Sequence, residues 1–528
     1  MTVKKLLFVL ALSFCSHCFS ASTEGKRFWI AFMENLTLNL NGRPAFSIVV
    51  SGKLDCSGTI EMPAKGIRIP FTVKGNVPQE ILLPDVILYN EGPDVRSDKG
   101  ILVTTTENVE VIAYHYRVYF SDATRVLPES ELDDKYTVVC ARDHDKSSPS
   151  SFVVVSTKDL NAIEITPSVF TDGFRNPGVP FTVILNAGET YQIQAYEDLS
   201  GTRIVSKNFR DFAVFGGGRQ GNINAPDCIS SPLADNHLYE QVLPDKSLGR
   251  HFLAVPLKGQ GSLPLTIVPV QDNTLVTING ASILLAAGQV YKTSVDTASE
   301  IRSDKPVNVM CYNKSQTCNE SRLGDPSQLG IWPSAFISRE QVFYSPGNLN
   351  FTTRKYFQSH FVNVACSSKY KNSVRLDGSL VTFSTFPLNP LFAYAQVKVD
   401  PGFHKITADS GGFGGVVYGF GDYDAYTYTL GYTIRESHSE VRLKVKLVTN
   451  PVTDGDLKLS YELPDSNIYS TQFEVYDAIG REVYSEANEV DLTRAMWHFK
   501  VNDLSAGTYY IRVRIRGAEA LLQPFIKL

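Results

Sequence analysis

The chain has 528 residues, of which 43% are hydrophobic and 20% charged, and 50 basic against 55 acidic residues give a formal net charge of −5. The hydrophobic fraction excludes a disordered chain, and the charge balance gives no electrostatic reason to expect a nucleic-acid partner. Many Tyr (25) and Phe (30), together with frequent Gly (37) and Pro (27), are typical of short strands and turns. We therefore expect a soluble, multi-domain, β-rich protein.

Residues 1–20 have the pattern of a secretion signal peptide. Lys4 and Lys5 precede an apolar run, and the small residues Cys18 and Ser20 stand before a cleavage site at Ala21. The apolar run is too short to cross a hydrocarbon layer of about 30 Å, and no later segment is apolar enough. The sequence therefore predicts an exported protein without a transmembrane segment.

Six cysteines remain after the signal peptide. Cys228 and Cys318 lie in long polar loops, and we predict that these two form a disulfide because export permits disulfide bonds. Cys140, Cys311 and Cys366 lie within apolar strand patterns, which predicts buried free thiols. The mature chain has no CxxC pair, and its histidines show no metal-binding spacing, so we expect no transition-metal site and no cofactor.

The same order of elements repeats four times between residues 21 and 435. Leu127 and Leu243 each begin a Leu-Pro-x-x-x-Leu-x-x-x-aromatic match, and the four repeats open at Phe28, Tyr136, Phe252 and Phe343. Short alternating or apolar runs bounded by Gly, Pro, Asn and Asp follow each opening. This pattern predicts an all-β fold built from antiparallel strands.

The number of strands in each repeat is typical of a β-sandwich-like module. We expect tandem modules at about 21–132, 133–247, 248–340 and 341–435. A β-propeller is the alternative, because each repeat could also form two four-stranded blades. The long loops 116–135, 219–250 and 313–340 are expected along one edge of this array, where binding residues are usually found.

A separate C-terminal unit, residues 449–528, follows a linker at 436–448 and is predicted to be a small antiparallel sandwich. Gly480 suits a hairpin position that needs a positive φ angle. The unit resembles the type A sorting domain of the type IX secretion system of Bacteroidota; the residues that carry this resemblance are Asn450, Pro451, Asp477, Gly480, Gly507, Tyr509 and Lys527. The resemblance implies an Ig-like sandwich, the type IX machinery as a partner, and a location on the outer cell surface or outside the cell.

Residues 25–432 resemble the bacterial version of the IgGFc-binding protein N-terminal domain family. The stretches that carry this resemblance are GKRFWIAFMEN (25–35), AYHYRVYFSDATRVLP (113–128), VFGGGRQ (214–220), DNHLYEQVLP (235–244) and NKSQTCNESRLGDPS (313–327). The resemblance implies a binding role and supplies no catalytic residues. It does not imply that immunoglobulin is the ligand.

Two groups of acidic residues are candidates for chemistry. Asp235, His237 and Glu240 lie close together in the sequence and Asp325 lies in GDPS, so carboxylates and imidazole could act as acid and base or bind a hard metal ion. The interpretation that we favour is a loop staple, in which the acids cap turn amides and Tyr239 packs beneath the loop.

Asp422 and Asp424 are candidate Ca²⁺ ligands, although GFGDYDAYTY lacks the spacing of a calcium loop and a strand-end turn is favoured. The glycine cluster at 216–218 is followed by no helix pattern that could bind phosphate, so crowding of the backbone at a turn explains it better.

Aromatic side chains in or beside the loops could stack on sugars or contact proteins. We predict a secreted, adhesin-like surface protein that recognises proteins or glycans without catalysis. The alternatives are a surface carbohydrate-active hydrolase that uses loop carboxylates and a structural component of a surface layer. The candidate binding residues are Tyr116, Tyr119, Asp235, His237, Tyr239, Glu240, Asp325 and Trp332.

Overall fold

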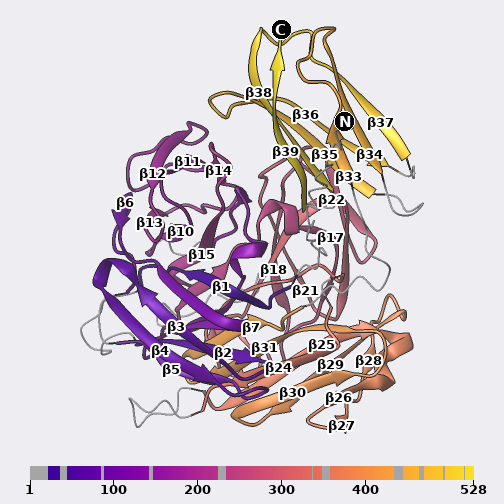
Figure 1. Ribbon diagram of the computed structural model, residues 1–528. Helices are drawn as coiled ribbons and strands as arrows, with labels where there is room; N and C mark the ends of the chain where they lie inside the picture. Colours follow the sequence, from indigo (N-terminus) through magenta and orange to yellow (C-terminus); the bar gives the residue numbers. More distant parts are fainter. Residues whose placement is uncertain are drawn as a thin grey trace, which may run out of the picture. The chain divides into compact units, whose positions relative to one another are not determined.

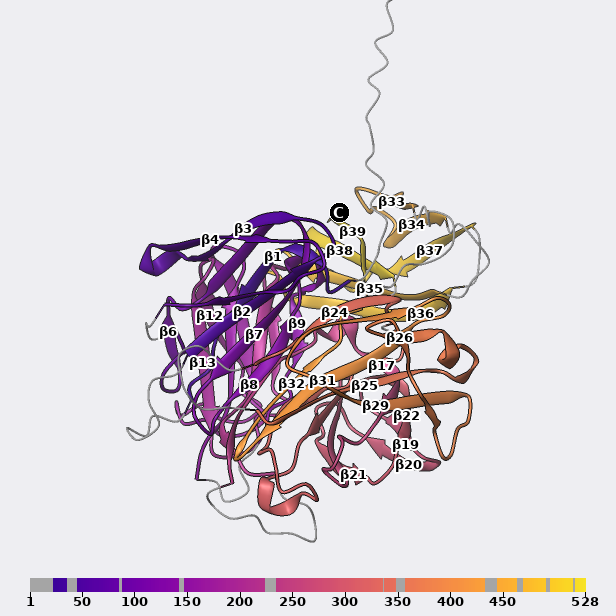
Figure 2. The same ribbon diagram turned by 90° about the horizontal axis from the view of Figure 1, so that it is seen from below.

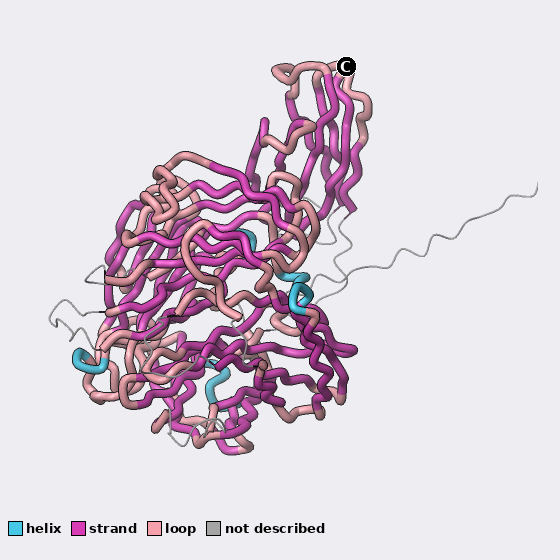
Figure 3. Tube along the Cα trace, turned by 90° about the vertical axis from the view of Figure 1, so that its left-hand side faces the viewer, coloured by secondary structure: helices cyan, strands magenta, loops and turns pink. Residues whose placement is uncertain are grey.

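The computed structural model describes residues 22–35, 45–84, 88–141, 147–223, 234–335, 337–347, 357–432, 444–462, 469–490, 494–515 and 518–528. Strands dominate throughout these residues, and the helical segments are short 3₁₀ turns (Figure 3). The strand pairs of the sheets are antiparallel, as in β2 with β7 and β25 with β31. This confirms the predicted all-β, antiparallel fold class. The described chain divides into two compact units, within 21–434 and 435–528.

The first strand group of the larger unit is one seven-stranded sheet (Figure 1). Its members are β1 (Gly25–Ile30), β2 (Ala45–Gly52), β3 (Cys56–Met62), β4 (Ile67–Val73), β5 (Gln79–Leu82), β7 (Ile101–Tyr116) and β8 (Asp122–Val126). The long strand β7 pairs with β1, β2, β3 and β8. The short strand β6 (Val95–Ser97) leaves this group and pairs with β13 of the second.

The second group has two sheets, ordered β16-β15-β10-β13-β6 and β12-β11-β14-β9. Its strands are β9 (Lys135–Thr137), β10 (Ser150–Ser156), β11 (Asn161–Thr166), β12 (Phe181–Leu185), β13 (Thr190–Ala195), β14 (Arg203–Ser206), β15 (Phe212–Gly221) and β16 (Asn236–Gln241). Its core lies between the two sheets and includes Phe152, Ile163 and Ile193.

The third group is a seven-stranded sheet in which β22 is the long central strand. Its strands are β17 (Gly249–Ala254), β18 (Leu263–Pro269), β19 (Thr274–Ile278), β20 (Ala281–Leu285), β21 (Tyr291–Val295), β22 (Ser299–Tyr312) and β23 (Gln328–Gly330).

The fourth group again has two sheets, ordered β24-β30-β26-β27 and β28-β29-β25-β31-β32. Its strands are β24 (Glu340–Ser345), β25 (Ser359–Ser367), β26 (Val374–Leu376), β27 (Ser379–Leu380), β28 (Ser384–Thr385), β29 (Phe392–Val399), β30 (Gly402–Ala408), β31 (Phe413–Gly421) and β32 (Asp424–Thr429). The module boundaries drawn from the sequence remain a prediction.

The two Leu-Pro matches fold alike. Pro128 and Pro244 are extended and each precedes a one-turn 3₁₀ helix, and Leu132 and Leu248 each donate a backbone N–H to close that turn. The 3₁₀ turns are η1 (Pro63–Lys65), η2 (Glu129–Glu131), η3 (Asp245–Ser247), η4 (Gln316–Cys318) and η5 (Ser368–Ser373). The sequence repeat therefore corresponds to a repeated local structure.

The four strand groups close into a ring rather than extending as a row. Separate buried clusters join the first group to the second, the second to the third, and the third to the fourth. A fourth cluster joins the first group to the fourth, through Tyr114 and Tyr116 on one side and Tyr426 and Val362 on the other. The last strand of each group, β8, β16, β23 and β32, lies where the groups meet, and β8 lies beside both β16 and β32. We call these four the central strands. Figure 2 shows β8 and β32 next to each other.

The first and last described segments of the ring meet at Thr23 and Tyr432. The Thr23 N–H donates to the carbonyl of Tyr432 at 3.0 Å, and the Tyr432 N–H donates to Thr23 Oγ1 at 3.0 Å. Thr23 Oγ1 also lies 2.8 Å from Oε1 of the buried Glu110, which pairs with Arg125 of β8 at 3.1 Å. The ring is thus closed by backbone and side-chain hydrogen bonds next to a buried ion pair.

The expectation that the long loops run along one edge is wrong in part. Segments of 116–135, 219–250 and 313–340 form the central strands β8, β16 and β23 instead. Their sequences look loop-like because they are rich in polar residues, yet the residues of these three strands are buried. Inside the ring these polar groups find hydrogen-bond partners on other groups, which local patterns do not reveal.

The cysteines follow the predicted division as far as the described residues reach. Cys140, Cys311 and Cys366 are buried free thiols, as predicted, and Cys56 is also buried and free. Cys318 is disulfide-bonded. Its predicted partner Cys228 lies outside the described residues, so that pairing stays a prediction. The predicted signal peptide also lies outside them.

The C-terminal unit pairs a three-stranded sheet, β33-β34-β37, with a four-stranded sheet, β36-β35-β38-β39. Its strands are β33 (Lys444–Leu447), β34 (Asp456–Glu462), β35 (Tyr469–Asp477), β36 (Glu482–Val490), β37 (Arg494–Lys500), β38 (Gly507–Ile515) and β39 (Ala518–Lys527). Gly480 has a φ of 80° in the hairpin between β35 and β36, as predicted. Among the described residues of the whole chain, no helix has the length and apolarity to cross a membrane.

Candidate functional site

The central strands meet at the carboxylate of Asp122, the first residue of β8. Its Oδ1 accepts the backbone N–H groups of Ala123 at 2.9 Å and Thr427 at 3.3 Å, and its Oδ2 accepts those of Tyr239 and Gln328, each at 3.1 Å. One buried side chain thus binds all four central strands. Burial raises the pKa of Asp122 well above its usual range, and the N–H donors oppose that shift.

Glu240 on β16 forms a second link between groups. Thr124 Oγ1 of β8 donates to its Oε2 at 2.8 Å, and the N–H of Gly330 on β23 donates to its Oε1 at 3.2 Å. Burial raises the pKa of Glu240 to about 8, against the opposing effects of these hydrogen bonds and of Arg125. Glu240 therefore joins three groups and is shielded from solvent.

His237, which precedes Glu240 on the same strand, is also buried. Its Nδ1 lies 3.2 Å from the carbonyl oxygen of Arg219, and its ring contacts that of His115 edge-on with the centroids 4.6 Å apart. Burial lowers the pKa of His237 to about 4, so the imidazole is uncharged at neutral pH.

The predicted tyrosines of this region face inward as well. The Tyr239 hydroxyl donates to the carbonyl of Ala31 at 3.0 Å, and that of Tyr116 donates to Glu80 Oε1 at 3.3 Å. Both side chains are at most 1% exposed. His237, Tyr239 and Glu240 are therefore buried on a strand. Glu240 accepts a main-chain N–H from the neighbouring strand β23, whereas the staple interpretation expected a turn amide within a loop.

The predicted acidic residues of the third and fourth groups meet around Gln316. The Gln316 N–H donates to Asp325 Oδ1 at 2.9 Å, and its Nε2 donates to Asp422 Oδ1 at 3.0 Å. Asp424 Oδ1 accepts the N–H of Ser121, from the first group, at 3.1 Å. Burial raises the pKa of Asp325 well above its usual range, and the charge of Asp424 adds to this.

Asp235, just before β16, accepts a hydrogen bond from Gln220 Nε2 at 2.8 Å. The structure shows no group of three or more His, Cys, Asp and Glu side chains placed to hold a metal ion within its described ranges. The carboxylates instead accept hydrogen bonds from main-chain and amide N–H groups. Asp422 and Asp424 as Ca²⁺ ligands remain a sequence prediction.

Tyr119 and Trp332 are the partly exposed members of the predicted set. Tyr119 lies edge-on to Tyr423 with the ring centroids 6.3 Å apart, and Trp332 lies edge-on to Tyr432 at 5.0 Å. The first pair joins the first and fourth groups, and the second lies at the ring closure. The eight predicted residues therefore do not form one exposed site.

Sequence reasoning missed Asp122, although a signal exists. Asp122, Asn236 and Asp424 each begin a central strand, and each side-chain Oδ1 accepts the N–H of the next residue at 2.8–3.1 Å. An Asp or Asn directly before an alternating run, at the same place in three repeats, marks these positions.

Two exposed features were also missed. The 168–180 loop between β11 and β12 presents Phe170 and Phe174, which are 51% and 82% exposed. Hydrogen bonds from Phe174 N–H to the Thr171 carbonyl (2.9 Å) and from Arg175 N–H to Thr171 Oγ1 (3.1 Å) fold this loop tightly. Two aromatic rings thus project from a well-defined loop.

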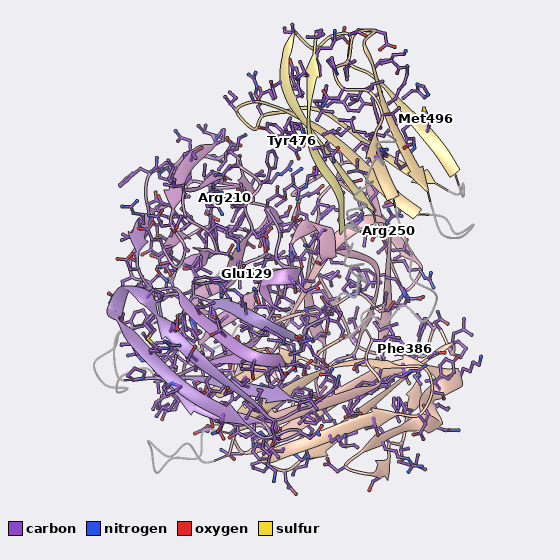
Figure 4. The ribbon with its side chains drawn as sticks, in the orientation of Figure 1. Glu129, Arg210, Arg250, Phe386, Tyr476 and Met496 are labelled. Carbon is purple, nitrogen blue, oxygen red and sulfur yellow. The ribbon has the colours of Figure 1, made fainter. Side chains whose placement is uncertain are left out.

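The other feature is a cavity of about 330 Å³ between the third and fourth groups. It is lined by the β19–β20 hairpin, β22 and the 386–389 loop, from which Phe386 is labelled in Figure 4. Glu300 of β22 lies in its wall, where Oε1 is 2.6 Å from both His251 Nε2 and Arg302 Nη2. Asn389 Nδ2 donates to Glu300 Oε2 at 3.1 Å across the two groups.

Burial would raise the pKa of Glu300, but hydrogen bonds from Arg302, Asn389 and His251 outweigh that effect and lower it. Glu300 is therefore ionised at neutral pH. The pair Glu300 and Arg302 presents a carboxylate and a guanidinium side by side at the cavity wall.

In the C-terminal unit, the predicted sorting residues lie at turns and along the last two strands. Asn450 Oδ1 accepts the N–H of Ile526 on β39 at 3.0 Å, while Pro451 follows it and Lys527 ends β39. Asp477 accepts the Arg481 N–H at 2.9 Å in the Gly480 hairpin. Gly507 begins β38, and the Tyr509 hydroxyl donates to the Ser505 carbonyl at 3.0 Å.

Comparison with known proteins gives two family matches. The model described as "IgGFc binding protein" matches residues 122–419, and the model described as "Secretion system C-terminal sorting domain" matches residues 449–526. The human IgGFc-binding protein is 23% identical over 203 residues, which is 37% of this chain and 4% of the human protein. The chain thus spans a small part of that relative's length.

Two solved structures show low similarity. One is a BSP domain of a biofilm-associated protein, at 9% identity and a TM-score of 0.15, covering 58% of this chain and 80% of that one. The other is a tetra-tandem repeat from the extending region of a large adhesion protein, at 10% identity and a TM-score of 0.16, covering 79% and 93%. TM-scores this low carry no weight for fold or function.

Proposed function

Because this chain belongs to the IgGFc-binding protein family, we propose that its ring of four strand groups recognises a protein or glycan ligand without catalysis. The C-terminal sorting domain indicates that the protein is secreted and lies on the outer cell surface or outside the cell. It also implies the type IX secretion machinery as a partner. A bacterium of the Bacteroidota, which uses this route, is the source that we propose.

The observation that carries this proposal is that the acidic residues of the central strands are buried and hydrogen-bonded to the backbone. A hydrolase built on loop carboxylates needs them free in an accessible cleft. Asp122 and Glu240 are at most 2% exposed, and both accept hydrogen bonds from backbone groups of neighbouring strand groups. These carboxylates therefore hold the ring together, which supports recognition by its exposed loops and cavity.

A printed array of glycans and glycoproteins that includes immunoglobulin Fc, probed with the full secreted chain, tests the proposal. We expect saturable binding to at least one class of printed ligand, without turnover of that ligand. Absence of binding together with assembly of the protein into sheets or fibres would overturn the proposal in favour of a structural surface component. Cleavage of a printed glycan would overturn it in favour of a hydrolase.

A further inference from the structure

We propose that the cavity between β22 and the 386–389 loop binds a neutral sugar at the end of a glycan. This inference rests on the proposed binding function and adds the ligand class and its site. The cavity volume of about 330 Å³ lies at the lower end of the range for small-ligand pockets, roughly 300–1,000 Å³. It suits a terminal sugar and is too small for a folded protein surface.

The polar wall matches the chemistry of adjacent hydroxyl groups. Glu300 can only accept hydrogen bonds and Arg302 can only donate them, and their side chains lie 2.6 Å apart at the closest atoms. Neighbouring sugar hydroxyls each donate and accept, so one can donate to the carboxylate while the next accepts from the guanidinium. Arg302 is available for this because its side chain is 58% exposed.

The charges of this wall favour a neutral ligand. The negative charge of Glu300 lies next to the positive charge of Arg302, and the rest of the lining consists of uncharged residues. An anionic ligand drawn to Arg302 would also meet Glu300, and a cationic ligand drawn to Glu300 would meet Arg302. A neutral hexose is repelled by neither charge.

The lining also offers an apolar surface to the C–H face of a sugar ring. Leu388 is 69% exposed, and the buried Phe386 and Ala298 lie beneath the same cavity. The hydrogen bond from Asn389 to Glu300 fixes the Leu388 loop against β22. The loop that carries Leu388 is therefore held in place before a ligand arrives.

The cavity is suited to holding a sugar and not to cleaving it. Glu300 is the only carboxylate among its described lining residues, whereas most glycoside hydrolases place two carboxyl groups on either side of the bond that breaks. The ligand is therefore expected to leave the cavity unchanged.

Saturation-transfer NMR with the full secreted chain can test the site. The probes are the methyl glycosides of galactose, mannose and N-acetylglucosamine, with methyl N-acetylneuraminate, an anionic sugar, as the comparison. We expect at least one neutral glycoside to bind and the anionic one to bind more weakly. Leu388→Asp and Arg302→Gln should each weaken that binding by about tenfold or more.

Matched controls are Leu380→Asp, on a leucine that is 59% exposed in the same strand group, and Arg375→Gln, on a partly exposed arginine. Neither residue lines the cavity, so both variants should bind like the wild type. Binding of a neutral glycoside that Leu388→Asp and Arg302→Gln leave unchanged would overturn the site. So would an array on which proteins bind and sugars do not, although the proposed binding function would then stand.

Discussion

At the scale of single residues, Asp122 has the largest structural role, because its carboxylate accepts a backbone N–H from each of the four central strands. Asp122→Asn replaces one acceptor oxygen with a donor and leaves at least one buried N–H without a partner. We expect the free energy of unfolding to fall by about 1–3 kcal/mol for each such group. Denaturant unfolding measures this, with the exposed Asp98→Asn as control; equal stabilities for both variants would refute the role.

The raised pKa of Glu240 predicts that the free energy of unfolding depends on pH. Its pKa is raised from the ordinary value of 4.5 to about 8 in the folded protein. Between these values the folded state keeps a proton that the unfolded state releases, so the contribution of Glu240 to stability is full below pH 4.5 and is lost as the pH rises through about 8.

Thermal unfolding of wild type and Glu240→Gln across this pH range isolates the effect, because the other titrating groups are common to both proteins. We expect the stability of the wild type relative to the variant to decline with rising pH, by up to about 1.4 kcal/mol per unit. The amide of the variant keeps the size of the side chain and does not titrate. A difference that stays constant between the two pH limits would contradict the assignment.

At the scale of elements, the glycine cluster at 216–218 shows what local patterns reveal and what they do not. From the sequence alone we predict that these glycines relieve crowding of the backbone at a turn. The backbone is crowded there, but the glycines lie within strand β15. A Cβ at Gly217 would overlap the carbonyl oxygen of Leu238 on β16. The pairing of β15 with β16 therefore depends on glycine at this position.

Gly217→Ala should destabilise the protein by about 1–3 kcal/mol, since main-chain atoms cannot move aside as a flexible side chain can. Gly347→Ala is the control, because among the described residues its added Cβ would meet only Pro401 Cβ, at an ordinary 3.7 Å. Hydrogen exchange should locate the loss of protection in β15 and β16. An unchanged exchange rate in both strands would show that the backbone accommodates the methyl group.

The difference between local sequence patterns and contacts across strands explains which elements the sequence could predict. Apolar or alternating runs such as β2 and β10, and the Gly480 hairpin, follow local rules and were predicted as strands and turn. The central strand β16 did not look like a strand, because His237 and Glu240 are polar on a buried strand. Their partners, the Arg219 carbonyl, Thr124 and Gly330, lie in other strands, and contacts between distant segments leave no mark on a local pattern. The cavity at Glu300 was missed for the same reason.

At the scale of the whole molecule, the four strand groups of the larger unit form a ring because the fourth group returns to the first. Tyr114, Tyr116, Tyr426 and Tyr428 share one buried cluster at this junction. Each group thus packs on two neighbours through a buried cluster. A closed ring needs a link between its first and last segments, and the contact of Thr23 with Tyr432 supplies it.

Thr23→Val tests this closure. Valine has the same shape but lacks the hydroxyl, so the Tyr432 N–H and the Glu110 carboxylate each lose a buried partner. Because the link joins both ends of the ring, we expect amide exchange to rise in β1 and around 430–432 together, while β10 and β18 stay protected. Hydrogen-exchange mass spectrometry measures this, with Thr59→Val as control, since the Thr59 hydroxyl bonds only within the first group. A rise confined to β1 would show that Thr23 supports only the adjacent strand β1 and does not close the ring.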